Sequence, residues 1–223
     1  MGKLILLNDV STDLDDVVLL ASDITVPSNR TGNLQADIIA NYVLEKVPVI
    51  DYIYHSDAIR IRKLVHKIRA DYKGKLQLGK TSTQALLRER NFGVLDRSPI
   101  NFESDMFSHS RIKAENGESV SECRIRVIKV ITEIISYQNY DKVILVVSHP
   151  FVCQIAFNAL LQKPHTTLTQ FWQEKGSFVI LDYKKSYGLQ WSFLNGHNAV
   201  SNLSYTQEQI YNQILGNKRT PSG

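Results

Sequence analysis

The stretch Lys142–Val147 (KVILVV), which ends just before Ser148 and His149, decides the fold class. The run is continuous, apolar and rich in β-branched residues, which is typical of a central parallel strand covered on both faces. Apolar residues recur at helical spacing before it, over Ser119–Ser136, and after it, over Phe151–Leu161. A buried strand between two amphipathic helices indicates an α/β protein.

The same alternation of strand and helix patterns extends from this stretch in both directions. Further strands are predicted at Lys3–Asn8, Val49–Tyr54, Leu76–Leu78, Ser177–Tyr183 and Leu189–Phe193. Further helices are predicted at Gly32–Val47 and Asp57–Tyr72. We therefore predict a three-layer α/β fold with a mostly parallel central sheet and helices on both faces. In such a sheet, functional side chains gather beyond the carboxyl ends of the parallel strands.

The composition is that of an ordinary globular protein, with 43% hydrophobic and 22% charged residues among 223. It excludes a disordered or fibrous chain. No window of about 18 apolar residues occurs, so no membrane span is predicted. The first residues do not resemble a secretory signal, and the two cysteines, Cys123 and Cys153, make no disulfide framework, so a cytoplasmic setting is expected. The net charge of +4 is spread along the chain, which argues against nucleic-acid binding.

One domain is expected over residues 1–215, with a flexible tail over 216–223. Residues 90–116 contain few apolar side chains and many turn formers, so they are predicted to form an insertion or lid. A last helix is predicted at Tyr205–Leu215, with an apolar face that suits either its own sheet or a partner.

Five segments carry recognisable motifs in a fixed order. They are Gly32–Ala36 (GNLQA), Ser56–Arg60 (SDAIR), Leu87–Gly93 (LRERNFG), Gly117–Ser119 (GES) and Val147–His149 (VSH). Together they resemble the motifs of the histidine phosphatase superfamily, whose best-known members are the cofactor-dependent phosphoglycerate mutases. The match spans nearly the whole chain, so the resemblance implies a phosphoglycerate mutase-like fold and a phosphatase-type site.

The resemblance fails after the first strand. The family has Arg-His-Gly-Glu there, and its His is the nucleophile that accepts the phosphoryl group. In this chain Asn8, Asp9 and Val10 follow, and the first His of the sequence is His55. An ionised Asp9 would repel a phosphoryl group at 4 Å by about 4 kcal/mol at an effective dielectric constant near 20, and Asn8 supplies no cation to offset this. Ordinary phosphohistidine chemistry is therefore not expected.

The rest of the family's site is present. The resemblance gives Arg60 the role of a phosphate-clamping cation, Glu89 that of general acid or base, and His149 that of the second histidine. Asn8, Arg60 and His149 are the candidate phosphate-binding positions, and Asp9, Glu89 and His149 the candidate catalytic ones. We expect Asp9 to pair with Arg60 and His149 and to fill the phosphate site from within. That pairing would lower the pKa of Asp9 and raise that of His149.

The segment after Asp9 is acidic, with Asp13, Asp15 and Asp16. It also resembles the opening of the nucleoside hydrolases, in which carboxylates hold Ca²⁺. Ser11 stands where that pattern has an acid, and nothing later in the chain matches it. We interpret the segment as a solvated acidic loop. No metal or other cofactor is expected, and these three residues are the candidates if one binds.

Two hypotheses for the function follow. In the first, the chain is a pseudoenzyme that keeps a remnant phosphate pocket to bind a phosphorylated small molecule, or uses its fold to contact a protein partner or a second copy of itself. In the second, it is a phosphoric monoester hydrolase with altered chemistry, in which Asp9 or His149 replaces the usual nucleophile, with or without a metal ion. Turnover of a phosphate ester distinguishes the two.

Overall fold

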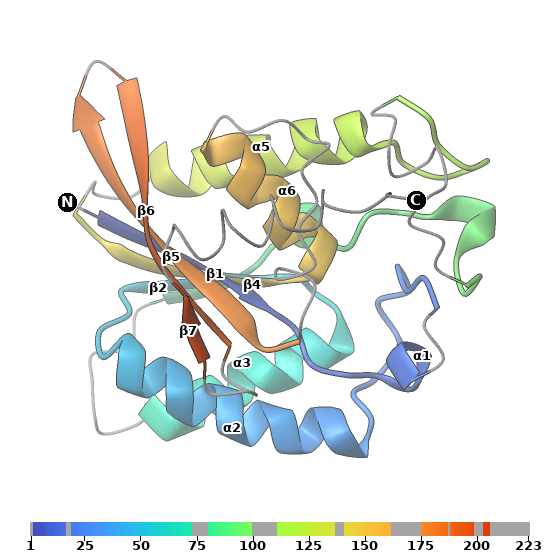
Figure 1. Ribbon diagram of the computed structural model, residues 1–223, viewed down its shortest axis with the longest axis horizontal. Coiled ribbons are helices and arrows are strands. Elements are labelled where there is room, and N and C mark those ends of the chain that lie inside the picture. The colour runs from blue at the N-terminus through green and yellow to red at the C-terminus, as the bar shows by residue number, and fades with distance from the viewer. Residues whose placement is uncertain are drawn as a thin grey trace, which may run out of the picture.

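A mixed seven-stranded sheet runs through the computed structural model (Figure 1). The structure describes residues 2–16, 19–72, 80–99, 111–136, 141–161, 175–186, 188–198 and 203–205. The strand order is β3-β2-β4-β1-β5-β6-β7. The first four of these are mutually parallel: β1 (Gly2–Asn8), β2 (Tyr52–His55), β3 (Lys80–Thr83) and β4 (Val143–Ser148). The last three each run antiparallel to the preceding strand in this order: β5 (Ser177–Ser186), β6 (Gly188–Asn198) and β7 (Leu203–Tyr205).

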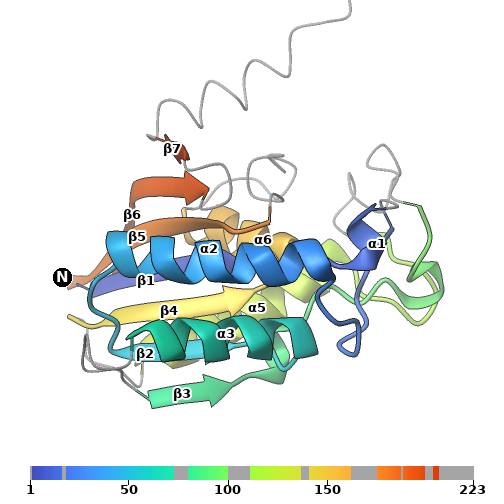
Figure 2. The same ribbon diagram turned by 90° about the horizontal axis from the view of Figure 1, so that it is seen from below.

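Helices cover both faces of the sheet, which confirms the predicted three-layer α/β fold (Figure 2). The helices α2 (Arg30–Lys46) and α3 (Ile59–Tyr72) lie on one face. The helices α5 (Val120–Ser136) and α6 (Pro150–Leu160) lie on the other. Shorter elements are the helix α1 (Asp13–Asp16) and the 3₁₀ turns η1 (Ala85–Leu87) and η2 (Gly93–Leu95). No helix in the described part of the chain is long and apolar enough to cross a membrane.

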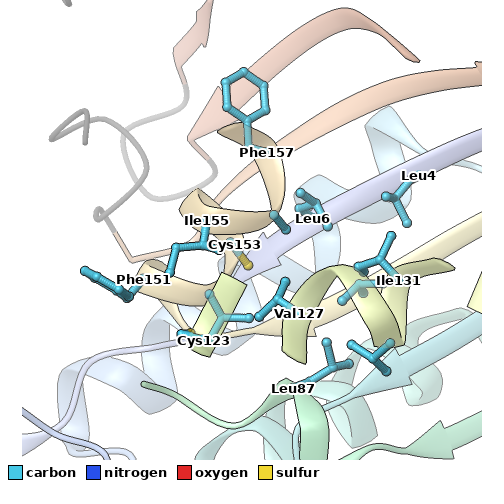
Figure 3. Close-up of a cluster of buried hydrophobic side chains, with 14 of the residues drawn as sticks. Leu4, Leu6, Leu87, Cys123, Val127, Ile131, Phe151, Cys153, Ile155 and Phe157 are labelled. Carbon is cyan, nitrogen blue, oxygen red and sulfur yellow. The ribbon is translucent and has the colours of Figure 1, made fainter. Parts of the chain in front are cut away.

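The alternation of side chains along β1 divides the core into two halves. Leu4 and Leu6 point into the half formed with α5 and α6, which Figure 3 shows in close-up. Ile5 and Leu7 point into the half formed with α2 and α3. A central strand covered on both faces must be apolar throughout, which is why its sequence shows no polar alternation.

The two cysteines lie in the first half of the core, as Figure 3 shows. Burial raises the thiol pKa of both Cys123 and Cys153, so they remain protonated and behave as small apolar residues.

Local contacts set the ends of the helices. The helix α2 begins two residues before the predicted start because the Asn29 side chain accepts a 2.7 Å hydrogen bond from the Gly32 backbone N–H. Gly32 also lies so close to the Ser11 carbonyl that a Cβ there would come within 2.1 Å of it. The helix α5 begins with a capping box, in which Ser119 and Glu122 each accept a hydrogen bond from the other's backbone N–H.

Several predictions fall on residues outside the described ones. They are the strand at Leu76–Leu78, most of the helix at Tyr205–Leu215 and the tail at 216–223. The described strand β3 follows the first of these, at Lys80–Thr83. Residues 100–110 also lie outside the described ones, so the lid formed by 90–116 stays a prediction.

Candidate functional site

The carboxyl ends of three neighbouring parallel strands bring polar residues together. Asn8 of β1 is in register with Ser148 of β4, and His55 of β2 with Val147 of β4. The residues that follow each strand, Asp9, Ser56 and His149, are therefore neighbours in space although far apart in sequence. We call Asp9, Ser56, Arg60, His149 and Lys175 the Asp9 cluster.

The Asp9 carboxylate lies at the centre of this cluster and is fully buried. Its Oδ2 accepts a 2.7 Å hydrogen bond from Arg60 Nε, and its Oδ1 accepts one of 2.8 Å from Lys175 Nζ. His149 Nδ1 lies 3.2 Å from Oδ2. The two cations supply the compensation that a buried carboxylate requires, because its loss of hydration otherwise costs several kcal/mol, on the order given for buried ion pairs.

Arg60 is held in place on its other side by backbone carbonyls. Its NH1 group donates to the carbonyls of Asp23 and Val26, and its NH2 group to His149 Nδ1 at 2.9 Å. The side chain is only 2% exposed, so Arg60 is not a solvated helix cation. It comes from the first turn of α3 and points inward at the strand ends.

The charges of the cluster fix Asp9 as an anion. Burial by itself raises the pKa of Asp9, but the charges of Lys175 and Arg60 outweigh burial and hold the pKa well below its usual range. The predicted direction for Asp9 is therefore confirmed.

The predicted direction for His149 is wrong. Burial, with a contribution from the charge of Arg60, lowers the pKa of His149 to about 4, although the Asp9 carboxylate opposes the shift. The buried Arg60 and the half-buried Lys175 already neutralise Asp9, so little favourable interaction remains for a third positive charge. His149 is neutral near pH 7.

The contacts of the imidazole indicate its tautomer. A guanidinium can only donate hydrogen bonds, so the contact from Arg60 requires a lone pair on Nδ1 of His149. The proton then lies on Nε2, which donates to Ser56 Oγ at 3.0 Å. Both ring nitrogens are thus engaged within the protein.

Glu89 lies beside the cluster in a half-buried position. The hydroxyl of Ser148 donates to the Leu87 carbonyl at 2.7 Å, which ties the Glu89 segment to the end of β4. Glu89 Oε1 accepts a 2.7 Å hydrogen bond from the Arg90 backbone N–H. Burial, together with the charge of Asp9, raises the pKa of Glu89 to about 7. A carboxyl with such a pKa can donate or accept a proton near neutral pH.

Residues 20–195 match the family model of the histidine phosphatase superfamily (branch 1). The chain belongs to this superfamily. A search of curated proteins found no match. The match begins after β1, so it does not include Asn8, Asp9 and Val10.

Solved structures of this superfamily's fold agree with the assignment. One is a variant of phosphoserine phosphatase from Entamoeba histolytica in complex with phosphoserine, at 18% identity and a TM-score of 0.74, covering 91% of this chain and 100% of that one. Another is a mycobacterial glucosyl-3-phosphoglycerate phosphatase in complex with VO₃, at 16% identity and a TM-score of 0.71, covering 86% of this chain and 96% of that one. At these identities the likeness concerns the fold.

Sequence reasoning missed Lys175, the second cation on Asp9. It lies just before β5, which pairs with β1, and the neighbouring Gly176 backbone N–H donates to the Asp9 carbonyl at 3.1 Å. Nothing in the local pattern distinguishes this lysine from a surface one; the only signal is its place before a strand adjacent to β1. Asn8, a predicted phosphate-binding position, instead donates from Nδ2 to Ser177 Oγ at 2.7 Å.

The acidic segment after Asp9 is partly solvated, as predicted, since Asp13 is exposed, but it is not a loop. Asp13–Asp16 forms the short helix α1. Asp15 accepts hydrogen bonds from the backbone N–H and hydroxyl of Thr12, and lies 3.3 Å from Lys175 Nζ, so it supports the Asp9 cluster. Among the described residues, no group of three acidic, histidine or cysteine side chains is placed to hold a metal ion.

Two further histidines, His55 and His66, differ in their exposure. His66 is exposed on α3. His55 is buried at the end of β2, with Nδ1 lying 2.8 Å from the Ser56 carbonyl. Burial lowers its pKa. His55 is therefore a neutral, buried residue next to Ser56 of the Asp9 cluster.

We predict that Glu89→Gln stabilises the protein above neutral pH. Glu89 ionises near pH 4.5 when unfolded but near pH 7 when folded, so the wild type loses stability as the pH rises between these values. Because the side chain is half-buried, we expect a gain of about 1–2 kcal/mol at pH 8 and no gain at pH 4. Urea unfolding at both pH values measures it. An equal effect of Glu89→Gln at pH 4 and pH 8 would contradict the shifted pKa.

Proposed function

We propose that this chain is a non-catalytic histidine phosphatase-like protein, a pseudoenzyme in which the Asp9 carboxylate occupies the place of a bound phosphoryl group. The observation that carries the proposal is the pairing of Asp9 with the buried Arg60 at 2.7 Å and the half-buried Lys175 at 2.8 Å. These cations are neutralised from within the chain. The family match, which begins only at residue 20, supports the view that the first strand end has diverged.

Asp9 is poorly suited to replace a histidine nucleophile. Its pKa is lowered and both of its oxygens accept charged hydrogen bonds, so its electron pairs are stabilised in the protein. A phosphoryl group that approached it would meet a negative charge. His149 is neutral, as a nucleophile must be, but both of its nitrogens contact protein groups.

The role that suits this arrangement is contact with another protein. A phosphorylated small molecule would have to displace Asp9 from Arg60 and Lys175 to use their charges, and the chain holds Asp9 in place by backbone as well as side-chain bonds. The fold around the cluster needs no ligand to balance these charges. We therefore favour protein contact over recognition of a phosphorylated metabolite.

One observation favours the second hypothesis, a phosphoric monoester hydrolase with altered chemistry. Glu89, with its pKa of about 7, and the neutral His149 are in protonation states that suit a general acid and a nucleophile. In that case the lone pair on Nδ1 of His149 would have to leave Arg60 and attack phosphorus, while Glu89 protonates the leaving alkoxide. Water would then hydrolyse the phosphohistidine, with the Glu89 carboxylate taking up its proton.

Hydrolysis of an aryl phosphate between pH 5 and pH 8, with and without Mg²⁺ or Ca²⁺, tests the proposal. We expect no turnover above the buffer rate from the wild type. We expect turnover from the Asn8→Arg/Asp9→His double variant, with Asp9→His alone as a second variant because Asn8 is fully buried. Wild-type turnover that His149→Ala or Asp9→Ala abolishes would reject the pseudoenzyme and support the hydrolase.

A further inference from the structure

The end strand β3 and the helix α3 beside it form a positively charged edge of the molecule. We propose that this edge binds an extended acidic segment of a partner protein, which adds to β3 as a further strand. The proposal rests on the proposed function only for the role of protein contact, and it places that contact at a surface whose residues are not members of the Asp9 cluster.

The first observation is the edge of β3 that faces away from β2. This strand ends the sheet, and within the described part of the chain it pairs only with β2. The Gln84 backbone N–H donates to the His55 carbonyl at the end of β2, 2.8 Å away. Backbone groups alternate along a strand, so Ser82 also faces β2, whereas the N–H and C=O groups of Thr81 and Thr83 face outward. An extended peptide can pair with these groups.

The second observation is a line of cations along the edge. Arg62 and Arg69 lie seven residues apart on one face of α3 and are exposed. From Arg62 to Arg69 the helix rises about 10 Å, close to the length of about 13 Å expected for a four-residue strand. Arg69 donates to the Thr81 hydroxyl, which places this line beside β3.

A second line of evidence places Arg62 on the same side as Arg69. The charges of both arginines contribute to the lowered pKa of His55, after the larger effect of burial, and His55 lies at the end of β2. Lys80 is exposed at the start of β3, and the alternation of side chains points it to the sheet face opposite Thr81. Cations therefore flank both faces of an added strand.

These cations form no ion pair within the described residues, although Arg69 donates to the Thr81 hydroxyl and the charge of Arg62, after the larger effect of Arg88, lowers the pKa of Asp57. The nearby acids are already paired: Asp57 with Arg88 at 2.8 Å, and Asp37 and Asp71 with Lys67. Within the described ranges, no carboxylate lies at ion-pair distance from Arg62, Arg69 or Lys80. Lysine at an edge discourages pairing with a neutral strand, and here it selects an acidic one. Nucleic acid is less suited, because it has no extended peptide backbone to pair with the outward N–H and C=O groups together.

Fluorescence anisotropy with a labelled peptide of about ten alternating Glu and Val residues tests this surface, since about one strand's length suffices to cover β3. We expect binding at low salt that weakens about tenfold in Arg62→Glu/Arg69→Glu, through lost charge complementarity. We expect a similar loss in Thr81→Pro, which removes one outward N–H and leaves the β2 pairing intact. Arg124→Glu/Lys129→Glu on α5 makes the same charge change on the opposite face and should bind as the wild type does.

Three outcomes would overturn the proposal. They are equal binding by Arg62→Glu/Arg69→Glu and the wild type, stronger binding of a single-stranded oligonucleotide of matched charge at the same edge, and self-association of the chain that Thr81→Pro abolishes. The aryl phosphate assay of the wild type is independent of these results. Turnover in that assay would reject the pseudoenzyme proposal without affecting the proposal of peptide binding. A failure of the wild type to bind the peptide would reject the binding proposal without affecting the pseudoenzyme proposal.

Discussion

Replacement of Asp9 by asparagine is expected to lower the free energy of unfolding at pH 7 by about 3–5 kcal/mol, the range for a broken buried ion pair. Arg60 is 2% exposed and Lys175 18% exposed, and each forms an ion pair with Asp9, at 2.7 Å and 2.8 Å. An amide has the same shape but no charge, so two like charges would remain close together and largely without water. Urea unfolding followed by circular dichroism measures the loss.

Asp182→Asn is the matched control for this prediction. Asp182 pairs with Lys3 at 2.8 Å, but the Lys3 side chain is 39% exposed, so its loss should cost no more than about 1 kcal/mol. Inorganic phosphate should restore part of the stability of Asp9→Gly, because an anion that binds only the folded state shifts the equilibrium toward it. An Asp9→Asn variant as stable as the wild type would show that Asp9 does not balance the two cations.

The wild type is expected to lose about 3 kcal/mol of stability between pH 7 and pH 4 through His149 alone. This residue takes up a proton near pH 6.5 when unfolded but only near pH 4 when folded. As the pH falls through this window, the unfolded chain gains a proton that the native protein excludes, so the native state is disfavoured. Below about pH 4 both states are protonated and the loss through His149 levels off.

His149→Gln isolates this contribution, because glutamine does not titrate. We expect the variant to be less stable than the wild type at pH 7. Between pH 7 and pH 4, however, its free energy of unfolding should fall by about 3 kcal/mol less than that of the wild type. His66→Gln, at an exposed position of α3, should leave the slope unchanged. Asp9 adds its own acid-induced loss only below its usual pKa of 3.8, outside this window. Identical slopes for the wild type and His149→Gln would refute the lowered pKa.

The sequence was sufficient to predict most of the fold, because the spacing of apolar residues follows the pattern of buried positions in each helix and strand. The run Lys142–Val147 is apolar at every position since β4 is covered on both faces, and the structure places it as the third strand of the sheet. The helices α2, α3, α5 and α6 all appear within two residues of their predicted starts. The apolar pattern did not predict strand direction, because a buried parallel strand and a buried antiparallel strand have the same run of apolar residues. The antiparallel half of the sheet follows from the pairing of β5 with β1.

The order of the motifs was sufficient to bring Asp9, Arg60 and His149 to one place, because parallel neighbouring strands share one carboxyl edge. The sequence by itself therefore determined the superfamily, the layers and the meeting of these three residues. Only the tertiary structure decided how their charges are balanced. Lys175 reaches Asp9 because β5 pairs with β1, and burial then keeps His149 neutral. Protonation depends on the number of charges and the depth of burial, which are properties of contacts between distant segments and are not recorded in any local pattern.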